Sequence, residues 1–205
     1  MLDGLMRKLI DPVVERWATR LVARGWTADR MTLLGLALGL GSALMIAVGL
    51  APWAVLPLLA GRIADGLDGA IARATAKTDL GGFFDIVADF LFYGAVPFAF
   101  AWAAPSLNAL PASFLLLTFY VNGASFLAYA VLAERHGMQT TSRGEKSLYF
   151  TSGLLEGTET IAFFVILCLW PQSFPLIATI FGVLCLCTTL ARVGLAARVF
   201  AAGRT

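Results

Sequence analysis

The sequence predicts an all-α integral membrane protein, with six transmembrane helices preceded by an N-terminal amphipathic helix in the membrane interface. The chain is 59% apolar and 14% charged, whereas a typical soluble domain carries about 25% charged residues. Its mean hydropathy is +0.81. The stretch Met31–Leu50 alone has 20 residues without a charge, enough to cross a hydrocarbon core of roughly 30 Å. Lipid must therefore be the solvent of most of the chain.

Residues 1–25 are expected to form the interfacial helix. Apolar residues recur at helical spacing from Leu2 to Leu21, and basic residues between Arg7 and Arg24 occupy much of the remaining surface. A helix of this kind lies among anionic lipid headgroups. Its repeated charges leave no compact apolar core of the sort that a signal peptide needs. A soluble tail is the competing interpretation.

Six apolar stretches follow within residues 28–199 and are expected to form one helix bundle, so that residues 1–205 make a single domain. Proline and glycine mark several of the joints between them, and Trp102–Pro111 is expected to be a loop. The predicted spans are Ala28–Gly49, Pro52–Ala74, Leu80–Ala101, Ala112–Ala133, Leu148–Leu169 and Ser173–Val199.

The distribution of basic residues predicts the orientation of the bundle. The loops Leu50–Ala51, Trp102–Pro111 and Trp170–Gln172 contain no lysine or arginine, whereas the alternate connections and both terminal segments contain several. Loops rich in lysine and arginine remain in the cytoplasm. Both termini are therefore expected to be cytoplasmic.

Ionisable residues inside the predicted spans mark the candidate site, because charge in a membrane is costly and is kept for function. These residues are Arg62, Asp65 and Asp68 in the second span and Asp85 and Asp89 in the third. The aspartates of each span share one helix face at 100° per residue, and the short connection Thr75–Asp79 makes the two helices antiparallel neighbours. The four carboxylates are thus expected at matching depths, two or three turns inside the cytoplasmic helix ends.

Four carboxylates at one depth cannot all ionise unless positive charge lies between them. Two divalent cations would supply that charge, and carboxylate oxygens are the ligands that Mg²⁺ and Mn²⁺ prefer. Two metal ions about 4 Å apart form the usual clamp for displacement at phosphorus. The competing interpretation pairs carboxylates with Arg62 and Arg73, or protonates them in a transporter. That interpretation accounts for two aspartates and leaves the other two unexplained.

The segment from Asp65 to Asp89 resembles the signature of the CDP-alcohol phosphotransferase family. The signature runs D-x2-D-G-x2-A-R, then a spacer, then G-x3-D-x3-D, and its fixed positions are occupied here by Asp65, Asp68, Gly69, Ala72, Arg73, Gly81, Asp85 and Asp89. The spacer after Arg73 is one residue shorter than in the common form, which shortens a surface loop. Residues 146–161 resemble a bacterial inner-membrane subgroup of the family, so we expect a multi-pass protein of the bacterial inner membrane.

The resemblance implies a role in phospholipid biosynthesis: transfer of a phosphatidyl group from CDP-diacylglycerol to a small polar alcohol, with release of CMP. It implies two Mg²⁺ or Mn²⁺ ions per site, held by Asp65, Asp68 and Asp85, with Asp89 touching metal and acting as general base. The residues expected to bind the CDP moiety are Asp65, Gly69, Ala72 and Arg73. Arg73 could instead be only a marker of topology. The expected partners are membrane lipid and a second copy of the chain, and no nucleic acid.

The sequence does not identify the acceptor alcohol. The candidate acceptor-binding residues are Arg143, Lys146, Glu156, Glu159 and Arg192. The basic ones would suit glycerol 3-phosphate or an inositol phosphate, although positive-inside bias also accounts for the two in the loop. The two glutamates could instead pair with Arg62 or Arg192 as structural contacts. A cation transporter and a catalytically silent lipid-binding relative are the competing functions.

Overall fold

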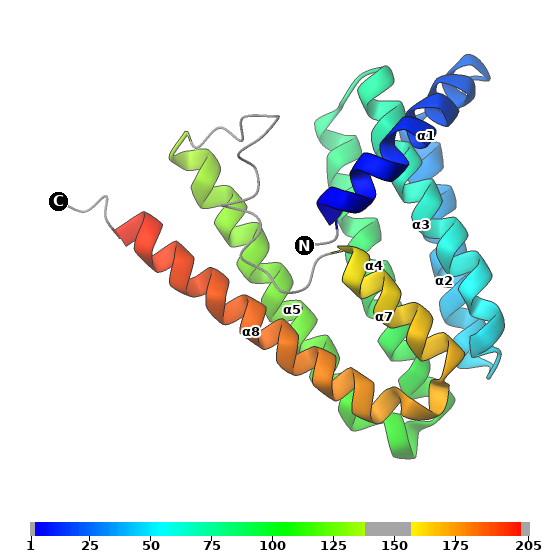
Figure 1. The fold of residues 1–205 in the computed structure, drawn as a ribbon, viewed down its shortest axis with the longest axis vertical. Coiled ribbons are helices and arrows are strands. Elements are labelled where there is room, and N and C mark those ends of the chain that lie inside the picture. Colours follow the sequence, from blue (N-terminus) through cyan, green and yellow to red (C-terminus); the bar gives the residue numbers. More distant parts are fainter. Residues whose placement is uncertain (1–2, 138–156, 202–205) are drawn as a thin grey trace.

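The protein is described by a computed structural model that covers residues 3–137 and 157–201, and these residues form helices joined by short connections (Figure 1). The helices are α1 (Asp3–Ala23), α2 (Ala28–Ala47), α3 (Ala51–Ala74), α4 (Asp79–Ala103), α5 (Pro105–Arg135), α7 (Gly157–Leu169) and α8 (Phe174–Ala201), with a short 3-10 helix η1 (Pro171–Ser173). The predicted all-helical class is therefore confirmed.

Four helical segments are long and apolar enough to cross a membrane: α2, α4, α5 and the segment Pro171–Phe200, which joins η1 to α8. Helix α3 has a similar length of 24 residues but carries the charged residues of the candidate site. Helix α7 is described over 13 residues, because the first part of the predicted fifth span lies outside the described residues. The count of six spans stays a prediction.

Short connections make successive helices antiparallel. Helix α2 passes into α3 through Gly49, whose φ of +84° lies in the left-handed region that favours glycine. Thr27 and Thr78 begin α2 and α4 as N-caps, each accepting a hydrogen bond from the backbone N–H three residues further on. The connection between α3 and α4 is short, running from Thr75 to Thr78, so the end of α3 lies near the start of α4. Beyond this connection the two helices pack closely against α2 rather than against each other, whereas the sequence predicted them as direct neighbours.

The predicted loop Trp102–Pro111 is wrong. Helix α4 continues to Ala103, and α5 begins at Pro105 after a single intervening residue. A proline fits the first turn of a helix because no backbone N–H donor is needed there. The Asn108 side chain donates a hydrogen bond of 2.8 Å to the carbonyl oxygen of Phe100, which satisfies an acceptor at the end of α4. Pro105 thus begins a helix, and Pro111 lies inside it, where the sequence suggested a loop.

Helix α2 is the centre of one half of the bundle, since it packs closely against both α3 and α4. Helices α5 and α8 lie side by side along the other edge (Figure 1). A shared core of aromatic side chains joins the two halves, and its largest fully buried members are Phe92, Phe100, Phe164 and Phe174.

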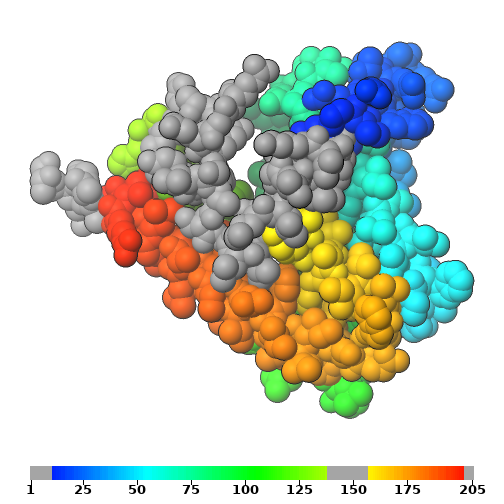
Figure 2. All heavy atoms as spheres, viewed as in Figure 1, coloured from blue at the N-terminus to red at the C-terminus, as the bar shows by residue number. Residues whose placement is uncertain are grey.

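Helix α1 packs across α3. Its Ala18 is buried against Ala70 and Ile71 of α3, while Trp17 and Val13 of α1 are exposed. Figure 2 shows this helix lying over one end of the bundle. Helix α1 thus covers the bundle with one face and exposes large apolar side chains on another, which is compatible with the predicted interfacial helix. Its position in the membrane stays a prediction.

The closest approach of α2 and α3 depends on glycine. A Cβ atom added to Gly61 would lie 3.0 Å from the carbonyl oxygen of Gly35 and 3.3 Å from the backbone nitrogen of Gly39. Both neighbours are backbone atoms, which cannot turn away as a side chain would. Glycine therefore sets the distance between the two helices.

We expect Gly61→Ala to destabilise the folded protein by about 1–3 kcal/mol, because the added methyl group pushes two backbones apart. Thermal unfolding in detergent, followed by circular dichroism, measures the effect. Gly41→Ala on α2 is the matched control, since nothing lies within 4 Å of its added Cβ. Equal melting temperatures for the two variants would contradict the proposed packing constraint.

Candidate metal centre between helices α3 and α4

The candidate site lies where α3 ends and α4 begins. Asp68 is six residues before the last residue of α3, and Asp85 is six residues after the first residue of α4, so both lie about 9 Å along their helices from the turn. Asp65 and Asp89 lie one turn deeper. The predicted matching depth follows directly from these helix bounds.

Asp65, Asp68 and Asp85, which we call the three-carboxylate group, each direct an oxygen to one place. These three oxygens all lie within 4.8 Å of one another. Two oxygens on opposite sides of a Mg²⁺ ion, at roughly 2.1 Å each, are about 4.2 Å apart. A small inward movement would therefore let the group bind a hard divalent ion, and three carboxylates form the oxygen donor set that such an ion prefers.

Asp68 is the most enclosed of the carboxylates, with an exposed fraction of 5%. Its Oδ2 atom accepts a hydrogen bond of 2.6 Å from the Thr32 hydroxyl on α2. This bond fixes the orientation of the carboxylate from a third helix. Sequence reasoning missed Thr32, which is 36 residues from Asp68 and has no part in the spacing of the signature.

Asp89 is held differently from the other three aspartates. Its Oδ1 atom accepts a hydrogen bond of 2.7 Å from Nη1 of Arg62, and the same nitrogen lies 3.4 Å from Oδ1 of Asp65. Arg62 thus forms ion pairs with one aspartate on each helix. The interpretation that pairs carboxylates with Arg62 is correct for Asp65 and Asp89.

The aromatic side chains of α4 hold Arg62 in place. Its Cζ atom lies 4.1 Å from the ring centroid of Phe92 and 6.0 Å from that of Tyr93, distances typical of cation–π contacts. The Arg62 side chain is only 8% exposed, and its Nε atom has no hydrogen-bond partner. The charged guanidinium of Arg62 therefore lies buried inside the site, packed against the aromatic rings.

The rest of the signature lines the outer part of the site. A Cβ atom added to Gly69 would lie 3.4 Å from Nη1 of Arg73, so the Arg73 guanidinium lies over the glycine. Arg73 is exposed and Ala72 is half-buried. A Cβ atom added to Gly81 would lie 3.3 Å from Oδ1 of Asp29, which places the start of α2 beside the start of α4. Sequence reasoning also missed Asp29.

The candidate acceptor-binding residues are described only in part. Arg143, Lys146 and Glu156 lie outside the described residues, and Glu159 is half-buried in the first turn of α7. Nη1 of Arg192 donates to the carbonyl oxygen and Oδ1 of Asn122, at 3.0 and 2.8 Å, and to Oγ of Ser125, at 2.7 Å. Arg192 thus links α8 to neutral groups on α5, away from the contacts of Arg62.

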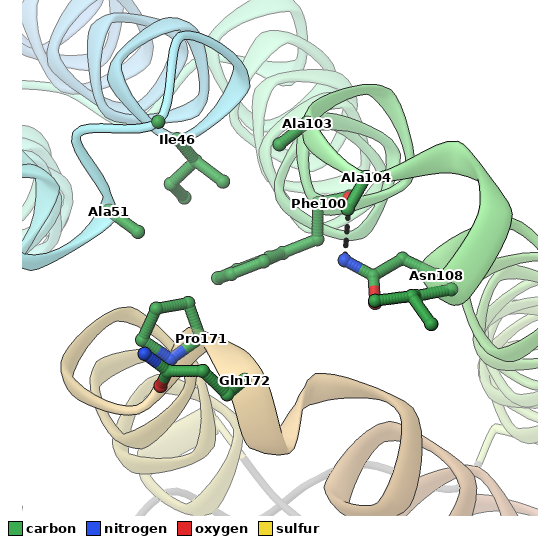
Figure 3. A pocket seen from close by; sticks show the side chains of 10 residues that line it. Ile46, Ala51, Phe100, Ala103, Ala104, Asn108, Pro171 and Gln172 are labelled. Atoms are coloured by element: carbon green, nitrogen blue, oxygen red, sulfur yellow. Dashed lines mark hydrogen bonds between the residues drawn. The ribbon is translucent and has the colours of Figure 1, made fainter.

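A separate cavity of about 300 Å³ lies at the opposite ends of these helices, where α2 turns into α3 and α4 into α5 (Figure 3). Its lining is mostly apolar. The polar side chains in the lining are Asn108 and Gln172, and the Asn108 amide is bound to the carbonyl oxygen of Phe100. None of the residues that line the cavity is ionisable.

The family described as CDP-alcohol phosphatidyltransferase matches residues 26–191, which include the whole carboxylate cluster. Among individual proteins, the inner membrane protein YnjF of Escherichia coli (strain K12) is 46% identical over 193 residues, or 94% of each chain.

The fold is similar to solved structures of phosphatidylinositol phosphate synthase (PgsA1) from Mycobacterium tuberculosis. The structure with CDP-DAG bound has a TM-score of 0.71 at 20% identity, covering 91% of this chain and 94% of that chain. The structure in complex with manganese and citrate has a TM-score of 0.68 at 21% identity, covering 88% and 87%. At these identities the similarity shows a common fold.

We expect Thr32→Val to weaken the binding of a divalent ion about 10–100-fold, because the Asp68 carboxylate loses the donor that orients it. Titration of detergent-purified protein with Mn²⁺, followed by electron paramagnetic resonance, measures the affinity. Thr32→Ser keeps the hydroxyl group and should bind nearly as well as the wild type. An unchanged affinity in Thr32→Val would show that the bond does not support the metal centre.

Proposed function

The chain belongs to the CDP-alcohol phosphatidyltransferase family, and we propose that it transfers a phosphatidyl group from CDP-diacylglycerol to a small polar alcohol, releasing CMP. The observation that carries this proposal is the convergence of the signature carboxylates: three of them lie within 4.8 Å of one another, and the fourth is fixed beside them by Arg62. No fixed position of the signature is lost, which argues against a catalytically silent relative.

The membrane setting suits a lipid donor. We propose a multi-pass protein of the bacterial inner membrane, supported by its similarity to an inner membrane protein and by its apolar helices. We also propose that the chain has six spans, forms a single domain over residues 1–205 and keeps both termini in the cytoplasm. With the carboxylates about two turns from the helix ends, the diacylglycerol tails can remain in lipid while the pyrophosphate reaches the site.

Asp65, Asp68 and Asp85 would hold the divalent ion, for which we propose Mg²⁺ or Mn²⁺. PgsA1, which shares the fold, has been solved in complex with manganese. When bound, the metal supplies positive charge that stabilises the pyrophosphate and the departing CMP. The resemblance to the family implies two ions at such a site.

The remaining residues would bind the donor and move the proton. We propose that Gly69 and Ala72 leave room for the CDP moiety, with Asp65 beside it, and that Arg73, over Gly69, meets a phosphate oxygen. Asp89 would accept the proton of the attacking hydroxyl. The new bond joins the acceptor oxygen to the phosphorus that carries diacylglycerol. The bond from that phosphorus to the oxygen of CMP breaks, and CMP leaves with the electron pair.

For the acceptor we propose a phosphorylated alcohol, glycerol 3-phosphate or an inositol phosphate, bound through Arg143, Lys146 and Arg192 and shaped by Glu156 and Glu159. The bonds from Arg192 to Asn122 and Ser125 support a fixed guanidinium that could meet a phosphate with its other nitrogen atoms. A homodimer, as the family resemblance implies, is the proposed assembly.

The direct test supplies detergent-purified protein with CDP-diacylglycerol, Mg²⁺ and one acceptor at a time: glycerol 3-phosphate, inositol phosphate, inositol or serine. CMP release is the readout. We expect release with one phosphorylated acceptor and at least about a 100-fold loss in Asp89→Asn, because that variant keeps the shape of the side chain but removes the base.

Asp79→Asn is the matched control, since Asp79 is an exposed aspartate on the same helix and should leave CMP release unchanged. Normal turnover of Asp89→Asn would contradict the role proposed for Asp89. If folded protein released no CMP with any acceptor, a catalytically silent lipid-binding relative would be favoured. Metal-dependent ion flux in proteoliposomes would favour a cation transporter.

Metal removal is a second test. We expect chelation with EDTA to abolish CMP release and added Mg²⁺ or Mn²⁺ to restore it, because the bound metal would supply the charge that stabilises the pyrophosphate and the departing CMP. The measurement is CMP release before chelation, after it and after metal is returned. Full activity in excess EDTA would contradict a metal-dependent reaction.

A further inference from the structure

The side of helix α1 that faces away from the bundle carries positive charge that the protein does not neutralise. Ala18, which is 1% exposed, marks the side that packs on the bundle. At about 100° per residue, Arg16 and Arg20 lie roughly 160° around the helix from Ala18, and Arg24 follows directly after the helix. All three arginine side chains are exposed. No carboxylate among the described side chains forms an ion pair with them.

Large apolar side chains share this side of α1. Val13 and Trp17 lie roughly 140° and 100° from the buried side, with exposed fractions of 53% and 51%, and Cζ of Arg20 lies 5.5 Å from the Trp17 ring centroid. The acidic residues Asp11 and Glu15 lie within about 60° of the buried side. We call the side chains opposite to it the outward face of α1: Val13, Arg16, Trp17 and Arg20.

The buried side of α1 lies against the part of α3 that is proposed to bind the donor. Ala18 packs on Ala70 and Ile71, which are neighbours in sequence of Gly69 and Ala72. We call residues 69–73 of α3 the donor-binding turn. Figure 1 shows α1 crossing this end of the bundle. Any contact that holds α1 in place therefore also supports the donor-binding turn.

The contact between α1 and α3 is small. Among the described side chains of α1, Ala18 is buried, and Val14, Leu21 and Val22 are partly buried against the same cluster. An amphipathic helix usually buries an apolar stripe of three or four residues in every two turns. Elements with few buried apolar contacts open at a low free energy. A second contact, on the outward face, would therefore hold α1 on α3 more firmly.

We propose that the outward face of α1 binds the anionic headgroups of membrane phospholipids, and that this contact strengthens the binding of CDP-diacylglycerol at the site. Arginine beside exposed tryptophan suits the membrane interface, where the ring enters the headgroup layer and the guanidinium meets phosphate. Charge complementarity selects anionic lipid, whose surface attracts each nearby arginine by a factor of about five. The effect on the donor rests on the proposed function, whereas the lipid contact does not.

The two halves of this inference are linked through one conformational state. Anionic lipid binds α1 where it lies on α3 and so raises the population of that state. The donor binds the same state, because its binding turn is the surface that α1 supports. Each ligand then raises the affinity for the other by the same factor. Donor lipid should therefore protect α1 from opening, which is measurable without turnover.

Amide hydrogen exchange of the full chain in nanodiscs tests the lipid contact. One set of nanodiscs contains phosphatidylcholine alone, and the other contains phosphatidylcholine with phosphatidylglycerol. Mass spectrometry of peptides from residues 11–23 measures the exchange of α1. We expect exchange to be at least about tenfold slower with phosphatidylglycerol, and the difference to shrink in high salt because salt screens charge. Inorganic phosphate added to the phosphatidylcholine nanodiscs should leave exchange unchanged.

The effect on the site is measured in the same nanodiscs. A small fraction of CDP-diacylglycerol, added to those that already contain phosphatidylglycerol, should slow the exchange of α1 further. The KM for CDP-diacylglycerol in CMP release should fall as the fraction of phosphatidylglycerol rises, with kcat nearly constant.

Two double variants make the test specific. Arg16→Gln with Arg20→Gln should abolish the dependence of exchange and of KM on phosphatidylglycerol, whereas lysine at both positions keeps the charge and should retain it. Arg135→Gln with Arg198→Gln is the matched control. It removes two exposed arginines from the last turns of α5 and α8 and should also retain the dependence.

The outcomes separate this inference from the proposed function. Equal exchange of α1 in the two kinds of nanodisc, or an equal loss in the control variant, would overturn the lipid contact. Slower exchange with an unchanged KM would overturn its effect on the site. Slower exchange without CMP release from any acceptor would contradict the proposed function and leave the lipid contact intact. The effect of CDP-diacylglycerol on exchange would then decide whether α1 and the site are coupled.

Discussion

Four carboxylates inside a lipid-facing helix bundle set the constraint on which the rest of the structure depends. Two like charges 4 Å apart repel by about 4 kcal/mol at an effective dielectric constant of about 20, so an uncompensated cluster would drive α3 and α4 apart. The chain supplies one compensating charge itself, through Arg62 between Asp65 and Asp89. The three-carboxylate group remains as the place where a divalent ion would supply the rest.

Helix α2 holds this arrangement together. Its backbone meets α3 at Gly35 and Gly61, and its Thr32 hydroxyl orients Asp68. A Cβ atom added to Gly39 would lie 2.7 Å from the ring of Phe92, the same ring that lies against the Arg62 guanidinium. Glycine contacts that look purely structural therefore also position the charged groups. A substitution that changes the packing of α2 against α3 or α4 is therefore expected to move the charged side chains as well.

The sequence predicted the carboxylates and most helix bounds because both depend on local spacing: the signature fixes the aspartates, and apolar length fixes the spans. The loop at Trp102–Pro111 was predicted wrongly because proline both ends and begins helices, and the cap by Asn108 depends on the neighbouring helix. Thr32 and Asp29 were missed because their partners are distant along the chain. Arg62 was predicted as a possible partner of the carboxylates, but its preference for Asp89 over the other carboxylates depends on the packing of α4.

The central claim is that the signature carboxylates form the metal centre of a phosphatidyl transfer site. The most direct measurement of this claim is an anomalous difference map from crystals grown with Mn²⁺ and CDP-diacylglycerol. The account predicts Mn²⁺ density at Asp65, Asp68 and Asp85, with the pyrophosphate beside it. Pyrophosphate bound elsewhere, or the absence of a Mn²⁺ peak at these three carboxylates, would contradict it.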